Sequence, residues 1–248
     1  MSPNKMSPNK QPGAEIPDSL VIFPVTGIGE IVPGDDLAGM LADAADLRDL
    51  DVLVVTQKVV SKAEGRMVEI DRDDPSGHKT IVEDESVRIL RRRGDLIISE
   101  TTHGFICANA GVDLSNVQEG YAVLLPVDSD RSARRIRDVV RAKLGIEIGV
   151  IISDTFGRPW RSGVTDVAIG SAGIGPILDL RGTNDALGRE LQVTEVAVVD
   201  ELAAAADLVM GKSTGYPAAI VRGIPAHWFR SGTVLDEIVR DPKDDLFR

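Results

Sequence analysis

The chain has 248 residues, of which 43% are hydrophobic, and a formal net charge of −11. A chain of this length buries about 70–75% of its unfolded surface without disulfides or metals, so we expect a globular protein. The negative charge argues against nonspecific binding to nucleic acid or an anionic membrane. The one cysteine, Cys107, cannot form an internal disulfide and the first residues contain no apolar signal-peptide segment, so we expect a cytoplasmic protein.

The first residues contain the polar pentapeptide Met-Ser-Pro-Asn-Lys twice. Such a pattern cannot build a core, so we expect residues 1–17 to be a disordered leader or a cloning remnant. No Pro/Gly/Ser linker divides the rest, and we expect residues 18–248 to form one folded unit. In chain order the patterns predict strand 21–25, helix 36–50, strand 52–56, helix 83–93, strand 96–99, strand 121–125, helix 132–144, strand 148–153, strand 177–180, helix 194–209 and strand 218–221. Because helices and strands do not alternate strictly, we expect an α+β or irregular mixed α/β fold.

Residues 151–161, Ile-Ile-Ser-Asp-Thr-Phe-Gly-Arg-Pro-Trp-Arg, carry the strongest functional signal. The expected strand delivers Asp154 and Thr155, followed by Arg158 and Arg161, into a loop broken by Gly and Pro. Carboxylate and hydroxyl oxygens can hold a hard cation, and arginines can bind phosphate or carboxylate. The same residues also fit a strand-end Asx-turn with solvated arginines.

A second acidic turn follows the apolar residues 105–108, in the sequence Ala-Gly-Val-Asp-Leu-Ser-Asn. It offers Asp113 and, three residues later, the amide of Asn116. Two carboxylates from separate strand ends can share one divalent ion or bracket two, so Asp113 and Asp154 form the candidate pair. Cys107 lies in an apolar run and is interpreted as a core residue rather than a nucleophile.

The familiar nucleotide motifs are missing. Gly211-Lys212-Ser213-Thr214 resembles the end of a P-loop, but Ala206 stands where the first glycine is required and the segment follows a helix rather than a strand. The three histidines are too scattered to indicate a zinc site. A phosphate site in this chain must therefore be of another kind.

Several long motifs, in one order from about residue 22 to residue 248, resemble the coenzyme F420-0:L-glutamate ligase family. They are Phe-Pro-Val-Thr-Gly-Ile-Gly-Glu-Ile, Val-Val-Thr-Gln-Lys-Val-Val-Ser-Lys-Ala-Glu-Gly-Arg, Ala-Gly-Val-Asp-Leu-Ser-Asn, Ser-Asp-Thr-Phe-Gly-Arg-Pro-Trp-Arg-Ser-Gly, Val-Thr-Glu-Val-Ala-Val-Val-Asp-Glu and Asp-Leu-Phe-Arg. The resemblance implies a mixed α/β fold, an intertwined homodimer, and a GTP-dependent ligase that adds L-glutamate to F420-0, and to F420-1 as a further substrate, through an acyl phosphate.

The resemblance also implies roles for individual residues. Two divalent ions, Mg²⁺ or Mn²⁺, are expected, with K⁺ as a further candidate. The expected metal ligands are Asp113 and Asp154 for one ion and Thr155 for the other; Asp113, Asp154 and Lys62 are the expected catalytic residues. The expected GTP-binding residues are Ile28, Gly29, Glu30, Ile31, Gln57, Lys62 and Asn116. In some relatives a serine replaces Gln57. The substrate candidates are Arg158 and Arg161, for which a structural ion-pair role is the alternative, and the weaker metal candidates are Asp166 and Glu195.

Two other functions fit the same residues. A two-metal phosphatase or kinase would use the carboxylates on another phosphorylated substrate, and a non-catalytic regulator would bind GTP without turnover. Family relatives include fusions to a flavin-dependent reductase domain, so a fused or separate reductase is an expected partner. We expect no nucleic-acid or membrane partner.

Overall fold

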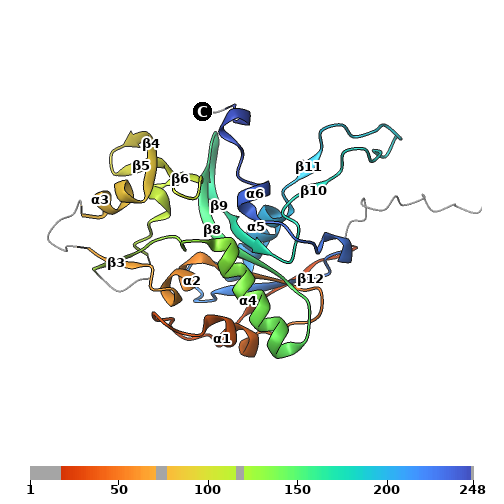
Figure 1. Cartoon of the computed structure of the whole chain (residues 1–248), viewed down its shortest axis with the longest axis horizontal. Coiled ribbons are helices and arrows are strands. Elements are labelled where there is room, and N and C mark those ends of the chain that lie inside the picture. Colours follow the sequence, from red (N-terminus) through yellow and green to blue (C-terminus); the bar gives the residue numbers. More distant parts are fainter. Residues whose placement is uncertain (1–17, 71–76, 116–119, 247–248) are drawn as a thin grey trace, which may run out of the picture.

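The computed structural model describes residues 18–70, 77–115 and 120–246. Its central element is a five-stranded mixed sheet in the order β1-β12-β2-β8-β9 (Figure 1). Only β2 and β8 are parallel within this sheet, and the other neighbours are antiparallel. The five strands are β1 (Val21–Val25), β2 (Val52–Thr56), β8 (Gly149–Arg158), β9 (Arg161–Ala172) and β12 (Ala218–Arg222).

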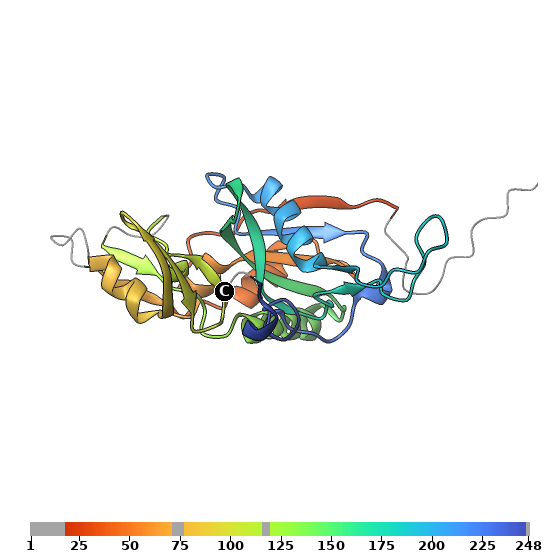
Figure 2. The same ribbon diagram turned by 90° about the horizontal axis from the view of Figure 1, so that it is seen from above.

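The inner strands are apolar because both faces of the sheet are covered. The first four residues of β2 and Val150 to Ile152 of β8 are fully buried, as expected for strands with helices on both sides. Helices α1 (Leu37–Ala44) and α4 (Ser129–Leu144) pack together on one face, and α5 (Val198–Met210) covers the other (Figure 2). These layers form the main hydrophobic core.

A smaller lobe lies beside β8 and β9, on the left in Figure 1. Helix α2 (Gln57–Ala63) leads into it from the end of β2. The lobe contains β3 (Met67–Glu69), α3 (Gly77–Asp84), β4 (Ser86–Arg93), β5 (Leu96–Thr101), β6 (Ile106–Ala108), the 3-10 turn η1 (Asn109–Gly111) and β7 (Tyr121–Val123). Strands β4, β5 and β6 form one sheet, and β3 pairs with β7.

On the other side of the main sheet, an arm projects from the body (Figures 1 and 2). It contains the short antiparallel pair β10 (Leu178–Asp179) and β11 (Glu195–Val196). The chain ends with η2 (Ala226–Trp228), α6 (Val234–Glu237) and η3 (Pro242–Asp244). The expected α+β class is confirmed. None of the helices among the described residues is both long and apolar enough to cross a membrane.

The predicted helix at 83–93 is wrong. Helix α3 ends at Asp84, and Ser86–Arg93 is strand β4, paired antiparallel with β5. Cross-strand contacts hold this pair: Arg88 binds Glu100 at 3.1 Å, and the Ser86 hydroxyl donates to Ser99 at 2.7 Å. These partners come from outside the segment, and such packing overrides local preference.

The loop expected after residue 153 is also absent. Strand β8 continues through Asp154 and Thr155 to Arg158, and β9 returns from Arg161, so only Pro159 and Trp160 turn the hairpin. The polar side chains therefore lie on a paired ribbon, whose backbone groups are satisfied across the strands.

Three helix boundaries differ from the expected ones by three residues or more, and one of them is the start of the helix expected over 132–144, which begins at Ser129 as α4. The helix expected over 36–50 ends at Ala44, and the one expected over 194–209 begins at Val198, because β11 occupies Glu195–Val196. The expected strand at 121–125 is shorter, as β7 ends at Val123.

Candidate functional site

Asp154 lies in the middle of β8 and is half-buried. Its pKa is raised to about 7, mainly by burial and further by the charges of Asp166 and Asp113. Asp154 thus lies close enough to Asp166 and Asp113 to be repelled by their charges. A cation at this place would relieve that repulsion.

Asp113 reaches the site from the smaller lobe. Its backbone pairs with Val123, and three successive residues with positive φ precede this pairing, Asn109 (50°), Ala110 (52°) and Gly111 (72°). Left-handed backbone at the two non-glycine residues is strained and is frequent at functional sites. The strained turn lies just before Asp113.

Lys58 neutralises Asp113. Its ammonium lies 2.8 Å from Asp113 Oδ2 and donates to Ser115 Oγ at 2.9 Å, while the Ser115 N–H donates to Asp113 Oδ1 at 2.7 Å. Burial alone would raise the pKa of Asp113, but these hydrogen bonds and the Lys58 charge lower it. Asp113 is therefore ionised at neutral pH, beside the more basic Asp154.

Thr155 belongs to a second polar cluster, because side chains alternate across a strand and Thr155 points away from Asp154. Its hydroxyl donates to Asp166 Oδ1 at 2.6 Å, and Ser153 Oγ donates to Asp166 Oδ2 at 2.9 Å. Asp166, directly opposite Thr155 on β9, is only 3% exposed. Lys212 places its ammonium 2.5 Å from Thr155 Oγ1 and 3.0 Å from Asp166 Oδ1.

Of the three expected metal ligands, Asp154 and Thr155 are adjacent on β8 with side chains on opposite faces, and Asp113 is near enough for its charge to act on Asp154. Their donor atoms are all oxygen, which suits Mg²⁺ or Mn²⁺. Within residues 18–70, 77–115 and 120–246, however, no three His, Cys, Asp or Glu side chains form a group that could hold a metal ion. A cation here would need the Thr155 hydroxyl, water or the oxygens of a bound phosphate to complete its shell.

Most of the expected nucleotide residues belong to two segments, the one after β1 and helix α2. Glu30 Oε1 lies 2.5 Å from the ammonium of Lys62, which is 6% exposed. Ile31 is buried, whereas Gly29 and Glu30 are exposed. The segment after β1 and helix α2 thus meet through this ion pair.

Gln57 is the least accessible of these residues. Its side chain is 1% exposed and accepts a hydrogen bond from Ser61 Oγ at 2.9 Å. A nucleotide could contact the Gln57 side chain only after a local rearrangement. Asn116 lies outside the described residues.

The arginines of the hairpin tip lie apart from the carboxylates. Arg158 and Arg161 pair across the end of β8 and β9 and are exposed. Trp160 between them is 82% exposed, with φ of 57°. At about 3.3 Å per residue, Arg158 lies about 13 Å along the strand from Asp154.

The structure also places Cys107 and the two weaker metal candidates, Glu195 and Asp166. Cys107 is 5% exposed, and burial, with the charge of Asp154, raises its pKa to about 12, so the thiol is protonated at neutral pH. Glu195 lies on the arm and pairs with Arg181 at 3.0 Å. Asp166, by contrast, belongs to the cluster around Thr155.

The sequence did not single out Lys58 or assign a role to Lys212. Lys58 follows Gln57 directly and faces out of the same helix toward Asp113. Lys212 belongs to the segment at 211–214, which resembles the end of a P-loop. A P-loop follows a strand, whereas this segment follows the end of helix α5 at Met210, so it is not a P-loop.

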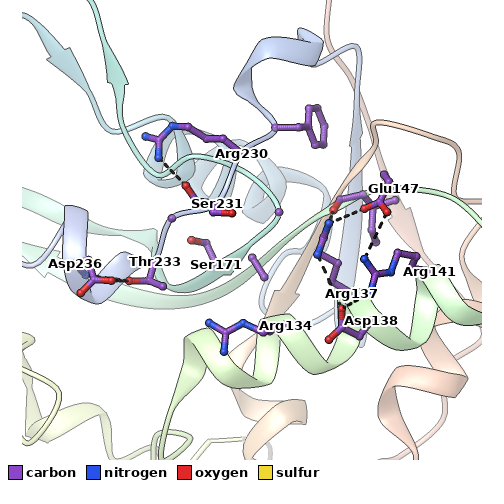
Figure 3. Close-up of a pocket in the computed structure, with 15 residues that line it drawn as sticks. Arg134, Arg137, Asp138, Arg141, Glu147, Ser171, Arg230, Ser231, Thr233 and Asp236 are labelled. Carbon is purple, nitrogen blue, oxygen red and sulfur yellow. Dashed lines mark hydrogen bonds and ion pairs between the residues drawn. The ribbon is translucent and has the colours of Figure 1, made fainter.

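A cavity of about 790 Å³ lies elsewhere, beside α4 (Figure 3). Its lining includes Ile148 and Ala172, which flank the start of β8, and several arginines. Three of these arginines are engaged in ion pairs: Arg137 with Glu147 at 2.6 Å, Arg141 with Asp138 at 3.6 Å, and Arg230 with Glu237 at 2.7 Å. The cavity is separate from the Asp154 site.

Comparisons with known proteins agree with the motifs. The family model described as F420-0:Gamma-glutamyl ligase matches residues 27–223. A protein of Methanopyrus kandleri named coenzyme F420:L-glutamate ligase is 44% identical, with 93% of this chain and 98% of the relative covered. Proteins of the same name from Methanothermobacter thermautotrophicus and Haloarcula marismortui are 43% and 40% identical, covering 90% and 92% of this chain and 97% and 95% of the relatives.

Proposed function

Because the chain belongs to the F420-0:gamma-glutamyl ligase family and is a ligase, we propose that it joins L-glutamate to the terminal carboxylate of coenzyme F420-0. GTP is the proposed co-substrate, an acyl phosphate the proposed intermediate, and γ-glutamyl amide, GDP and phosphate the products. F420-1 is proposed as a further acceptor. The observation that carries this proposal is the set of oxygen groups at β8: Asp154, whose pKa is raised by burial and by the nearby charges of Asp166 and Asp113, and Thr155, which is hydrogen-bonded to Asp166.

Amide formation from a carboxylate needs an activated acyl group, because an ionised carboxylate offers an amine no leaving group. Phosphoryl transfer from GTP supplies this activation. A bound Mg²⁺ or Mn²⁺ would neutralise phosphate charge, work that a P-loop performs in other enzymes. Asp113 and Asp154 would hold one such ion and Thr155 a second, with K⁺ as an additional candidate.

The protein's own charges support this arrangement. Asp113 stays ionised beside Lys58, while Asp154 retains a proton up to about pH 7. A cation bound at Asp154 releases that proton, so binding strengthens as pH rises through this range. Lys62, at the junction with Glu30, is the proposed point charge for a nucleotide phosphate.

The hairpin tip is the proposed contact for the acceptor. Arg158 and Arg161 are exposed guanidinium groups that suit a phosphodiester or a carboxylate. They lie on the same ribbon as Asp154, so an elongated substrate could reach both places. Trp160 adds an exposed aromatic surface between them.

A homodimer is the proposed assembly. The β10–β11 arm leaves the body of the protein, and its Leu187 and Val193 are 85% and 84% exposed. Large apolar side chains on a projecting arm favour contact with a second chain. A flavin-dependent reductase, fused or separate, remains a proposed partner on the family resemblance alone.

The proposal is tested by mass spectrometry of reactions with GTP, Mn²⁺, L-glutamate and F420-0. The expected products are γ-glutamyl F420, GDP and phosphate in equal amounts, and Asp154→Ala should lower all three together. A phosphatase or kinase would instead consume nucleotide or phosphoester without incorporating glutamate. A regulator would bind GTP and return it unchanged.

A further inference from the structure

Lys212 occupies a position that a metal ion would also favour. Its ammonium is surrounded by three oxygen atoms, Thr155 Oγ1 at 2.5 Å, Asp166 Oδ1 at 3.0 Å and Asp207 Oδ1 at 3.0 Å. Two of these residues, Asp166 and Thr155, are also hydrogen-bonded to each other. The ammonium is thus a cation held by an all-oxygen set of ligands.

The hydrogen bonds at Thr155 show how the two cations would compete. The hydroxyl has one proton and two lone pairs, and the proton is donated to Asp166. One lone pair therefore accepts from Lys212. A divalent ion on the remaining lone pair would lie within a few ångströms of the ammonium, where like charges repel strongly.

In the absence of another cation, the charge of Asp166 holds Lys212 at this site. This carboxylate is 3% exposed, and Ser153 and Thr155 supply only neutral hydrogen bonds. An unpaired buried charge is costly, so Asp166 needs a positive partner. Either an ammonium or a divalent ion can fill this need.

Lys212 is also able to leave. Its side chain is 58% exposed, and it follows Gly211, which ends α5 with a positive φ of 61°. A lysine has a long flexible stem and a compact charge, so it can move to a new anion without rearrangement of the helix. The phosphates of a bound nucleotide would be such an anion.

We propose that the Lys212 ammonium occupies the Thr155–Asp166 site in the nucleotide-free protein. A divalent ion replaces it there only when the phosphates of a bound nucleotide accept the ammonium. The inference rests on the proposed use of two divalent ions. It predicts ordered binding, with one ion bound at Asp113 and Asp154 before the nucleotide and the second bound together with it. Lys212 is thus a positioning residue that prevents a divalent ion from binding at the second site when no nucleotide is bound.

The test measures Mn²⁺ binding without turnover, by electron paramagnetic resonance and calorimetry, in the presence and absence of GDP. Wild-type protein should bind one Mn²⁺ per chain without nucleotide and two with GDP. Lys212→Met should bind the second Mn²⁺ without nucleotide, with an affinity at least tenfold higher than wild type. Lys212→Arg, which keeps the charge, and Lys243→Met, which removes an exposed lysine paired with Asp241, should behave like wild type.

Several results would overturn the inference. These are a wild-type protein that binds two ions without nucleotide, an unchanged second affinity in Lys212→Met, or no second ion even with GDP. The last result would leave glutamate ligation standing if the product still forms, so the two proposals fail separately. Lys212→Gln repeats the measurement if the thermal midpoint shows that Lys212→Met is not folded.

Discussion

Thr155 and Asp166 lie directly opposite each other on β8 and β9, and the Thr155 hydroxyl donates to the Asp166 carboxylate at 2.6 Å. Asp166 is therefore fixed in place, and its charge is one cause of the raised pKa of Asp154. Asp166→Asn should lower the Asp154 pKa from about 7, because the mutation removes a like charge and keeps the side-chain shape. Carboxyl ¹³C NMR titration of metal-free protein measures this shift, and an unchanged midpoint would contradict the geometry.

Asp154 should also make the stability of the metal-free protein depend on pH. Its pKa is about 7 in the folded state and about 3.9 when unfolded, so the folded state holds the proton more tightly. This contribution is fully present below pH 4 and is lost as pH rises through about 7. Urea unfolding in EDTA should therefore show a larger loss of stability between pH 5.5 and 8 in wild type than in Asp154→Asn.

Added Mn²⁺ provides the control for this pH effect. At pH 8 it should restore stability to the wild-type protein, because a bound cation replaces the lost proton at Asp154. It should restore much less to Asp154→Asn. Equal pH profiles for the two proteins would show that Asp154 has an ordinary pKa.

The core strands could be predicted from the sequence because their signal is local. Residues 52–55 are an uninterrupted apolar run, and the structure buries all four completely. The segment Ser86–Arg93 could not be predicted in this way, since its charged residues suit a helix and only pairing with β5 makes it a strand. Non-local pairing is the part of a fold that local patterns omit.

The same distinction applies to the candidate site. Asp113, Asp154 and Thr155 stand in distinctive motifs, so their residue types and family resemblance identified them. Lys212 reaches Thr155 across 57 residues of sequence, and no pattern near either residue indicates that contact. The contact follows from the packing of α5 against the sheet, which places the end of that helix near β8.

Loss of the two central carboxylates tests the metal site directly. Asp113→Ala and Asp154→Ala should each lower turnover by about 10²–10³-fold, as does the loss of a preorganised electrostatic group. Both proteins should still fold, because neither residue belongs to the hydrophobic core. Asp43→Ala, which removes an exposed carboxylate paired with Lys143 on another face, is the matched control for kinetic assays. Wild-type turnover in the double variant would exclude this site.

Nucleotide preference tests the proposed guanine site near Glu30 and Lys62. A ligand that binds only the folded state raises the thermal midpoint in proportion to its affinity and concentration. GDP with Mn²⁺ should therefore raise the midpoint more than ADP with Mn²⁺ at the same concentrations. Lys62→Ala should reduce the GDP shift, because it removes a nearby positive charge, and equal shifts with GDP and ADP would argue against a guanine-specific site.

Isotope tracing tests the order of the chemical steps. In the proposed route a carboxylate oxygen of F420-0 attacks the γ-phosphorus of GTP, the bond from phosphorus to the β-bridging oxygen breaks, and GDP leaves. The glutamate amine then attacks the acyl carbon and phosphate departs with the carboxylate oxygen. Carboxylate ¹⁸O in F420-0 should therefore appear in the released phosphate, one atom per amide formed. Without F420-0, GTP hydrolysis should be slow, since no nucleophile is positioned in line with the γ-phosphorus. Unlabelled phosphate alongside continued amide synthesis would rule out the acyl phosphate.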